Sequence, residues 1–151
     1  MANRGVNGID GHIATASGIA ASDPDATTFL VCGDLTALHD LSALGLANTA
    51  GLKIIIIDNR GGGVFNQLPF AEDSETFSRF FIAQQQVPLM AIAAAYGLDT
   101  YAFEAPSELR LPDILKRSGS CLCVISVCSQ NARLARSKLS KNIRNALESK
   151  P

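Results

Sequence analysis

Short runs of apolar and β-branched residues alternate with amphipathic segments along most of this chain. The clearest run is residues 53–58 (KIIIID), which is typical of a strand buried on both faces of a sheet. Residues 9–21 place apolar or small side chains at helical spacing and predict a helix. The same criteria predict further strands at residues 28–32, 100–103 and 121–127, and further helices after Thr36, at 88–96, after Ser107 and at 131–148.

The order of these elements predicts the fold class. Helices that alternate with short buried strands are typical of an α/β fold, a doubly wound and mostly parallel sheet with helices on both faces. A chain of 151 residues has the size of one domain, so residues 1–151 are expected to form a single unit. Residues 66–86 have no clear period and are expected to form a long loop or short helices.

The amino-acid composition argues against several classes of protein. An apolar content of 47% with 18% charged residues excludes a disordered chain, and the net charge of -1 argues against a dedicated nucleic-acid binder. Six of the thirteen basic residues lie in the final helix and tail: Arg133, Arg136, Lys138, Lys141, Arg144 and Lys150. An anionic partner would explain them, but the solvated face of a docked terminal helix is the favoured interpretation.

The four cysteines form no C-x-x-C pair, which argues against a zinc site or a thioredoxin-like motif. They are interpreted as small buried apolar side chains in a reducing compartment. The first residues do not resemble a signal peptide, and the apolar runs are too short to span a bilayer. A cytoplasmic protein without a membrane span is therefore expected.

Two of the predicted strands end in residues suited to metal and phosphate. The first is followed by Gly33-Asp34, and the second by Asn59, Arg60 and three glycines. Asp34 and Asn59 are twenty-five positions apart, about one α/β unit, so both side chains are expected at the carboxyl edge of the sheet, where ligands bind. A carboxylate, an amide oxygen and a loop carbonyl suit Mg²⁺, and glycines let backbone amides approach phosphate.

These segments resemble a known family. One pattern consists of Gly-Asp, twenty-odd further residues and then Asn. It is similar to the diphosphate-binding motif of thiamine-diphosphate enzymes. Within that superfamily, residues 3–11 (NRGVNGIDG), 33–44 (GDLTALHDLSAL) and 58–69 (DNRGGGVFNQLP) resemble the SEPHCHC synthase family of menaquinone and phylloquinone biosynthesis. The resemblance implies its C-terminal thiamine-diphosphate-binding domain and a transferase that joins 2-oxoglutarate to isochorismate with loss of CO₂.

The resemblance also implies roles at the diphosphate end of the cofactor. Asp34 and Asn59 would hold Mg²⁺ or Mn²⁺ through their side chains, and Gly61 would hold it through its carbonyl. Gly33 and Leu35 would border the diphosphate. The resemblance places the catalytic glutamate on another domain, so the catalytic set is incomplete in this chain; Arg4, Phe65 and Leu68 are the substrate-facing candidates.

Other matching positions would face the rings and the substrates. Ile9 matches the residue over which the cofactor bends, although an ordinary core isoleucine is an equal alternative. Val64, Phe65 and Leu68 match an apolar wall facing cofactor and isochorismate, or they anchor their own loop. Arg4 matches a contact to a substrate carboxylate.

The chain departs from the family in two respects. Asp58 stands where the family usually has asparagine, so it either changes metal affinity or closes the strand. The family's pyrimidine-binding domain, which contributes a catalytic glutamate from a neighbouring subunit, and its central domain have no counterpart here. A fragment or one half of a split enzyme is therefore expected, inactive alone and part of a homo-oligomer or of a complex with a partner chain.

Three alternatives remain open from the sequence. The domain would serve another thiamine-diphosphate enzyme, such as an acetolactate-synthase-like or phosphonopyruvate-decarboxylase-like protein, or it would be a non-catalytic interaction module that kept the fold. An NAD domain is disfavoured because no G-x-G-x-x-G follows the first strand.

Overall fold

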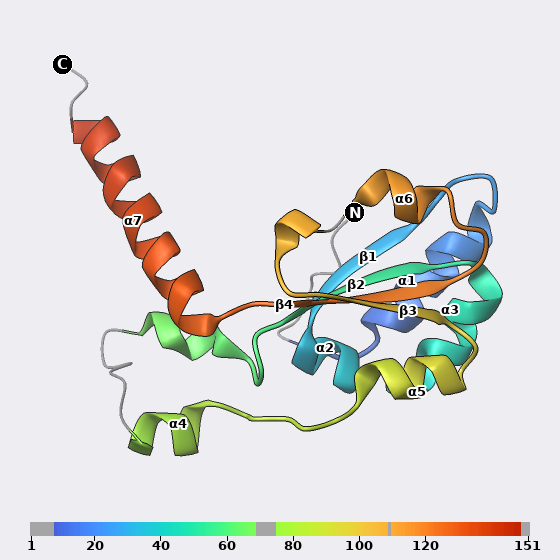
Figure 1. The fold of residues 1–151 in the computed structure, drawn as a ribbon, viewed down its shortest axis with the longest axis horizontal. Helices are drawn as coiled ribbons and strands as arrows, with labels where there is room; N and C mark the ends of the chain where they lie inside the picture. Colours follow the sequence, from blue (N-terminus) through green and yellow to red (C-terminus); the bar gives the residue numbers. More distant parts are fainter. Residues whose placement is uncertain (1–7, 69–74, 109, 149–151) are drawn as a thin grey trace.

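The computed structural model describes residues 8–68, 75–108 and 110–148 (Figure 1). The strands are β1 (Phe29–Gly33), β2 (Lys53–Asp58), β3 (Asp99–Phe103) and β4 (Cys121–Ser126). The helices are α1 (His12–Ser22), α2 (Asp34–Leu38), α3 (Leu44–Ala50), α4 (Glu75–Phe81), α5 (Leu89–Ala95), α6 (Leu111–Leu115) and α7 (Ser129–Glu148). Short 3-10 turns are η1 (Leu41–Ala43), η2 (Gly63–Gln67) and η3 (Pro106–Glu108).

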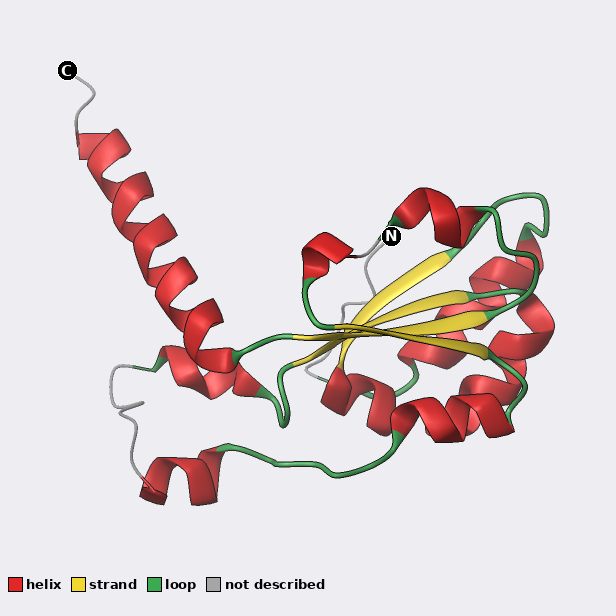
Figure 2. Ribbon diagram, viewed as in Figure 1, coloured by secondary structure: helices red, strands yellow, loops and turns green. Residues whose placement is uncertain are grey.

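The described strands form one parallel sheet in the order β1-β2-β4-β3 (Figure 2). β2 lies between β1 and β4. Near its carboxyl end, Ile57 of β2 is level with Gly33 of β1 on one side and with Ile125 of β4 on the other. The predicted α/β class and parallel sheet are confirmed. The carboxyl ends of β1, β2 and β4 consequently lie side by side at one edge.

Side chains of β2 alternate between two apolar layers. Ile54 and Ile56 face α1, α3 and α5, whereas Ile55 faces the layer covered by α6. Both layers are apolar because a parallel strand inside a sheet has both faces buried. The prediction of a doubly buried strand at 53–58 is therefore confirmed.

Removing part of this core should destabilise the domain. Ile56 is fully buried, so Ile56→Ala is expected to lower the free energy of unfolding by about 2–5 kcal/mol because it leaves a cavity. Val31 on the neighbouring strand is 62% exposed, and Val31→Ala should change that energy by less than about 0.5 kcal/mol. Urea unfolding of both variants checks the difference, and equal losses would contradict the assigned core.

The helix predicted after Thr36 is broken into α2, η1 and α3. Asp40 has φ -135° and ψ 27°, which ends the helical path between α2 and η1. The prediction of one helix after Thr36, with Leu38, Leu41 and Leu44 on its apolar side, is therefore wrong. Within the described ranges, residues 66–86 contain the end of η2 and the short helix α4.

The expectations for the two C-terminal helices also need correction. α6 begins after Arg110, with Pro112 in its first turn, rather than at a cap on Ser107. α7 leaves the body of the domain instead of docking on it, and none of its residues is buried (Figure 1). The apolar side predicted for that helix is 51–68% exposed at its four large residues, Leu134, Leu139, Ile143 and Leu147.

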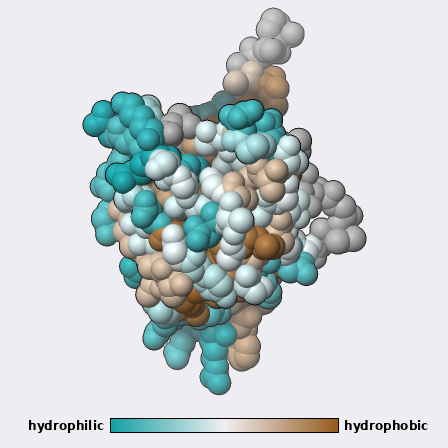
Figure 3. Space-filling model, turned by 90° about the vertical axis from the view of Figure 1, so that its right-hand side faces the viewer, coloured by the Kyte–Doolittle hydropathy of each residue, from teal (hydrophilic) through white to brown (hydrophobic). Residues whose placement is uncertain are grey.

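The end of the molecule opposite α7 has a mixed surface. Hydrophilic side chains there surround small apolar areas (Figure 3). Among the described residues, no helix combines the length and apolarity needed to cross a membrane.

Candidate functional site at the carboxyl edge of the sheet

Asp34 is the first residue after β1 and opens α2. Its side chain is only 4% exposed, and its partners are backbone N–H groups. Oδ1 accepts a hydrogen bond from Leu35 N at 2.9 Å, and Oδ2 accepts one from Gly61 N at 2.7 Å. This carboxylate therefore ties the end of β1 to the glycine turn that follows β2. Asp34 and Asn59 lie at the same edge of the sheet, as their spacing predicted.

The glycine turn is shaped by the side chain of Asn59. Its Oδ1 accepts hydrogen bonds from Gly62 N at 2.9 Å and Gly63 N at 3.1 Å. Arg60 has a φ of 61°, a left-handed conformation that non-glycine residues rarely adopt. Asp58 supports it, because Asp58 Oδ1 accepts a hydrogen bond from Arg60 N at 2.8 Å. Asp58, the last residue of β2, thus supports the turn that follows the strand.

Gly61 is packed against the segment that leads to α5. Its carbonyl accepts a hydrogen bond from Ala83 N at 3.0 Å. Its φ is 122°, and a Cβ at this position would lie 2.6 Å from the carbonyl oxygen of Ala83. A glycine is required here by both the backbone conformation and the close approach of a second backbone.

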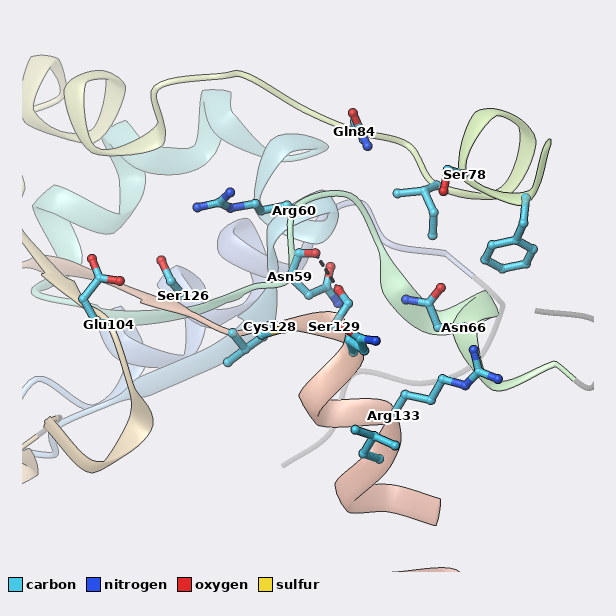
Figure 4. A pocket seen from close by; sticks show the side chains of 15 residues that line it. Asn59, Arg60, Asn66, Ser78, Gln84, Glu104, Ser126, Cys128, Ser129 and Arg133 are labelled. Atoms are coloured by element: carbon cyan, nitrogen blue, oxygen red, sulfur yellow. Dashed lines mark hydrogen bonds between the residues drawn. The ribbon is translucent and has the colours of Figure 1, made fainter. Parts of the chain in front are cut away.

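The first turn of α7 closes the site from the β4 side. Ser129 Oγ donates a hydrogen bond to the carbonyl oxygen of Asn59 at 2.9 Å (Figure 4). A cavity of about 740 Å³ opens beside this contact and is within the usual size of ligand pockets. Its polar lining includes Arg60, Gln84 and Arg133, and Figure 4 shows the two arginines on different sides of it. The cavity borders Asn59 but not Asp34.

Sequence reasoning missed Ser129 as a support of the site. Nothing in the local sequence marks it, because its role depends on β4 lying directly beside β2. The position of Asn59 relative to Asp34, by contrast, was predictable from the order of strands.

The remaining candidate residues are partly placed by the structure. Val64 and Phe65 lie in η2, immediately after the glycine turn, and are 64% and 46% exposed. Phe65 packs edge-to-face on Phe81, with ring centroids 6.0 Å apart. Leu68 follows η2 and is half-buried, while Arg4 lies outside the described residues.

Ile9 precedes α1 and is 41% exposed, so it is not the ordinary core residue that the sequence left as an alternative. Gly33 and Leu35 flank Asp34 at the end of β1.

The donor set fits a hard cation better than a soft one. Within the described ranges no three His, Cys, Asp or Glu side chains gather as a metal-binding group. The oxygens of Asp34, Asn59 and Gly61 all lie at the same sheet edge, and the buried Asp34 carboxylate accepts its hydrogen bonds from neutral N–H groups. Such an oxygen set, completed by phosphate, is typical of Mg²⁺.

Cys32 lies just before this carboxylate and is electrostatically coupled to it. Burial, followed by the charges of Asp34 and Asp40, raises the pKa of its thiol from 9.0 to about 12. At high pH the unfolded chain therefore loses the Cys32 proton more readily than the folded domain does, which favours unfolding. The corresponding contribution to stability is complete below about pH 9 and declines as the pH rises to about 12.

The raised pKa predicts selective alkylation of the cysteines. At pH 8, iodoacetamide should label the exposed Cys128 and leave Cys32 unmodified, because the thiolate is the reactive form. Peptide mass spectrometry after brief labelling measures the extent of alkylation at Cys128 and at Cys32. Equal labelling of the two thiols would contradict this environment for Cys32.

Together, the parallel sheet and the glycine turn at its carboxyl edge define an α/β domain built to bind a phosphorylated cofactor. The chain belongs to the thiamine pyrophosphate enzymes: the model of this family's C-terminal TPP binding domain matches residues 2–125. The family resemblance of the sequence motifs is thereby confirmed.

Several curated relatives carry one name, 2-succinyl-5-enolpyruvyl-6-hydroxy-3-cyclohexene-1-carboxylate synthase. The protein of this name from Pelodictyon phaeoclathratiforme is 46% identical over 125 residues, which cover 82% of this chain and 21% of the relative. That from Chlorobaculum parvum is 38% identical over 130 residues, covering 82% of this chain and 22% of the relative. The protein of this name from Chlorobium phaeovibrioides is 37% identical over 139 residues, which cover 89% of this chain and 24% of the relative. The chain thus spans about a fifth to a quarter of the length of these relatives.

Proposed function

We propose that this chain is the thiamine-diphosphate- and Mg²⁺-binding portion of a SEPHCHC synthase. The observation that carries the proposal is the buried Asp34 carboxylate joined to the Gly61 turn, in a chain 46% identical to a synthase of this name. The reaction would decarboxylate 2-oxoglutarate and join the remaining succinyl unit to isochorismate, in menaquinone or phylloquinone biosynthesis.

The residues at the carboxyl edge of the sheet would bind the cation through different oxygens. Asp34 and Asn59 would hold Mg²⁺ or Mn²⁺ by side-chain oxygens, with the Gly61 carbonyl as a third ligand. These groups are already ordered by hydrogen bonds, and Asn59 Oδ1 would exchange one of its two N–H partners for the cation. Bound thiamine diphosphate supplies the carbanion chemistry that amino-acid side chains lack.

The apolar and cationic residues would hold and orient substrates. Val64, Phe65 and Leu68 would form a wall that limits water near the reacting atoms, and the exposure of Val64 and Phe65 leaves room for a ligand or a second domain. Ile9 would support the bent cofactor, and Arg4 would pair with a substrate carboxylate.

The proposal requires a second domain. No residue of the proposed set is suited to act on the aminopyrimidine ring, so a pyrimidine-binding domain, from the same enzyme or from a partner subunit, must complete the site. We accordingly propose a homo-oligomer or a two-chain enzyme, working in the cytoplasm.

Complementation tests this function directly. The chain is mixed with the part of the Pelodictyon relative outside the 125 matched residues, in the presence of Mg²⁺ and thiamine diphosphate. CO₂ release from 2-oxoglutarate and product formation with isochorismate are expected in the mixture, and not with either component alone. A mixture that binds the cofactor but turns over only pyruvate would instead indicate an acetolactate-type enzyme.

A further inference from the structure

Asp40 is a buried carboxylate without a role in the proposed chemistry. Its side chain is 8% exposed, and Oδ2 accepts a hydrogen bond from Ala14 N at 2.9 Å, across 26 residues of sequence. Ala14 lies in the first turn of α1, whose N-cap residue Gly11 has no side chain to accept such a bond. Asp40 therefore caps α1 from another part of the chain, where the helix dipole favours a negative charge.

The backbone around Asp40 is itself held in place. Asp40 N donates to the carbonyl of Ala37 at 3.2 Å, and the Asp40 carbonyl accepts from Ala43 N at 3.0 Å. These bonds form the break between α2 and η1, where a continuous helix was predicted. The break places the carboxylate against the start of α1 instead of on a regular helix face.

This contact joins the two segments that would hold opposite parts of the cofactor. α2 begins with Asp34 at the metal end, and Asp40 comes directly after its C-terminal turn. α1 begins directly after the segment that contains Ile9. The hydrogen bond between Asp40 and Ala14 thus fixes where the Ile9 segment lies relative to Asp34.

The carboxylates of Asp34 and Asp40 have different surroundings. Both lie near Cys32, whose thiol they help to keep neutral. Asp34 presents its oxygens to the glycine turn, whereas Asp40 presents Oδ2 to the N-terminus of α1. The two carboxylates thus have different N–H partners, and Asp34 is the one that contacts the glycine turn at the proposed metal site.

We propose that Asp40 is a positioning residue, which sets the distance between the Ile9 support and the Asp34 metal end of the bound cofactor. This inference rests on the proposed function. A displaced support would leave the diphosphate anchored but the reacting rings misplaced, so turnover would suffer more than cofactor affinity. Small displacements of a reacting group are known to cost large factors in rate.

The test uses the complemented enzyme with three variants: Asp40→Ala, Asp40→Asn and, as a control, Asp25→Ala, which removes an exposed carboxylate. Asp40→Ala is expected to lower kcat about tenfold, while the Kd for Mg²⁺-thiamine diphosphate changes less than about threefold. Asp40→Asn keeps an oxygen acceptor for Ala14 N and should recover most of kcat. Thermal unfolding by circular dichroism verifies that each variant is folded.

A double-mutant cycle with Ile9→Ala tests whether Asp40 acts through Ile9. If it does, Asp40→Ala should reduce kcat much less in the Ile9→Ala background than in the wild type. Independent effects of the two substitutions, or an Asp40→Ala enzyme with wild-type kcat, would overturn the positioning role alone. A complemented wild type that binds no cofactor and shows no turnover would overturn the proposed function as well.

Discussion

Asp34→Ala is expected to abolish Mg²⁺-dependent binding of thiamine diphosphate in the complemented enzyme. The substitution removes the buried carboxylate at the glycine turn and leaves Gly61 N without its acceptor. Loss of a metal ligand should weaken binding more than the roughly 10- to 100-fold typical of residues that only support ligands, so we expect a loss of at least about 100-fold. Isothermal titration calorimetry with Mg²⁺ and the cofactor measures it.

Asp34→Asn provides the matched control for local structure. The amide oxygen can still accept the hydrogen bond from Gly61 N, but it carries no charge for a cation. We expect Asp34→Asn to retain the thermal stability of the wild type more closely than Asp34→Ala and still to lose metal-dependent binding. Unchanged cofactor affinity in both variants would rule out Asp34 as a metal ligand.

Gly61→Ala is expected to destabilise the domain by about 3 kcal/mol. The φ of 122° is strained for any residue with a side chain, and the new Cβ would lie 2.6 Å from the Ala83 carbonyl oxygen. The resulting shift would also disturb the turn that the side chain of Asn59 holds in place. Equilibrium urea unfolding gives the change in free energy.

Gly18→Ala is the control for the effect of adding a methyl group to a glycine. Gly18 lies inside α1, and a Cβ added there would have no atom within 4 Å beyond its chain neighbours and its own helix backbone. Alanine is the better helix former, so this substitution should stabilise the domain by up to about 1 kcal/mol. Similar destabilisation by both substitutions would contradict the packing of Gly61 on Ala83.

The sequence was sufficient to predict the sheet because its strands are buried runs with local signals. The isoleucines of β2 and the apolar run of β4 must be buried, and Gly33 and Gly119 interrupt the chain near strand ends. The position of α7 was not predictable in the same way. Its helical period is clear, but periodicity does not indicate which surface, if any, covers the apolar side.

The candidate site shows the same division between local and long-range information. Asp34 and Asn59 were predictable because each follows a strand, and parallel strands bring their carboxyl ends to one edge. Neither the contact of Ser129 nor that of Asp40 was predictable from the sequence. Their partners, Asn59 and Ala14, are distant in sequence, and strand order and the break after α2 determine these contacts.

Calorimetry of the wild-type chain tests the central claim most directly. Thiamine diphosphate is titrated with Mg²⁺ into the chain alone, and then into its mixture with the remaining part of the Pelodictyon synthase. We expect binding that requires Mg²⁺ and that appears or tightens in the mixture, because the second domain completes the site. Absence of binding in both experiments, with folded proteins, would contradict a cofactor site at this sheet edge and favour a non-catalytic interaction module.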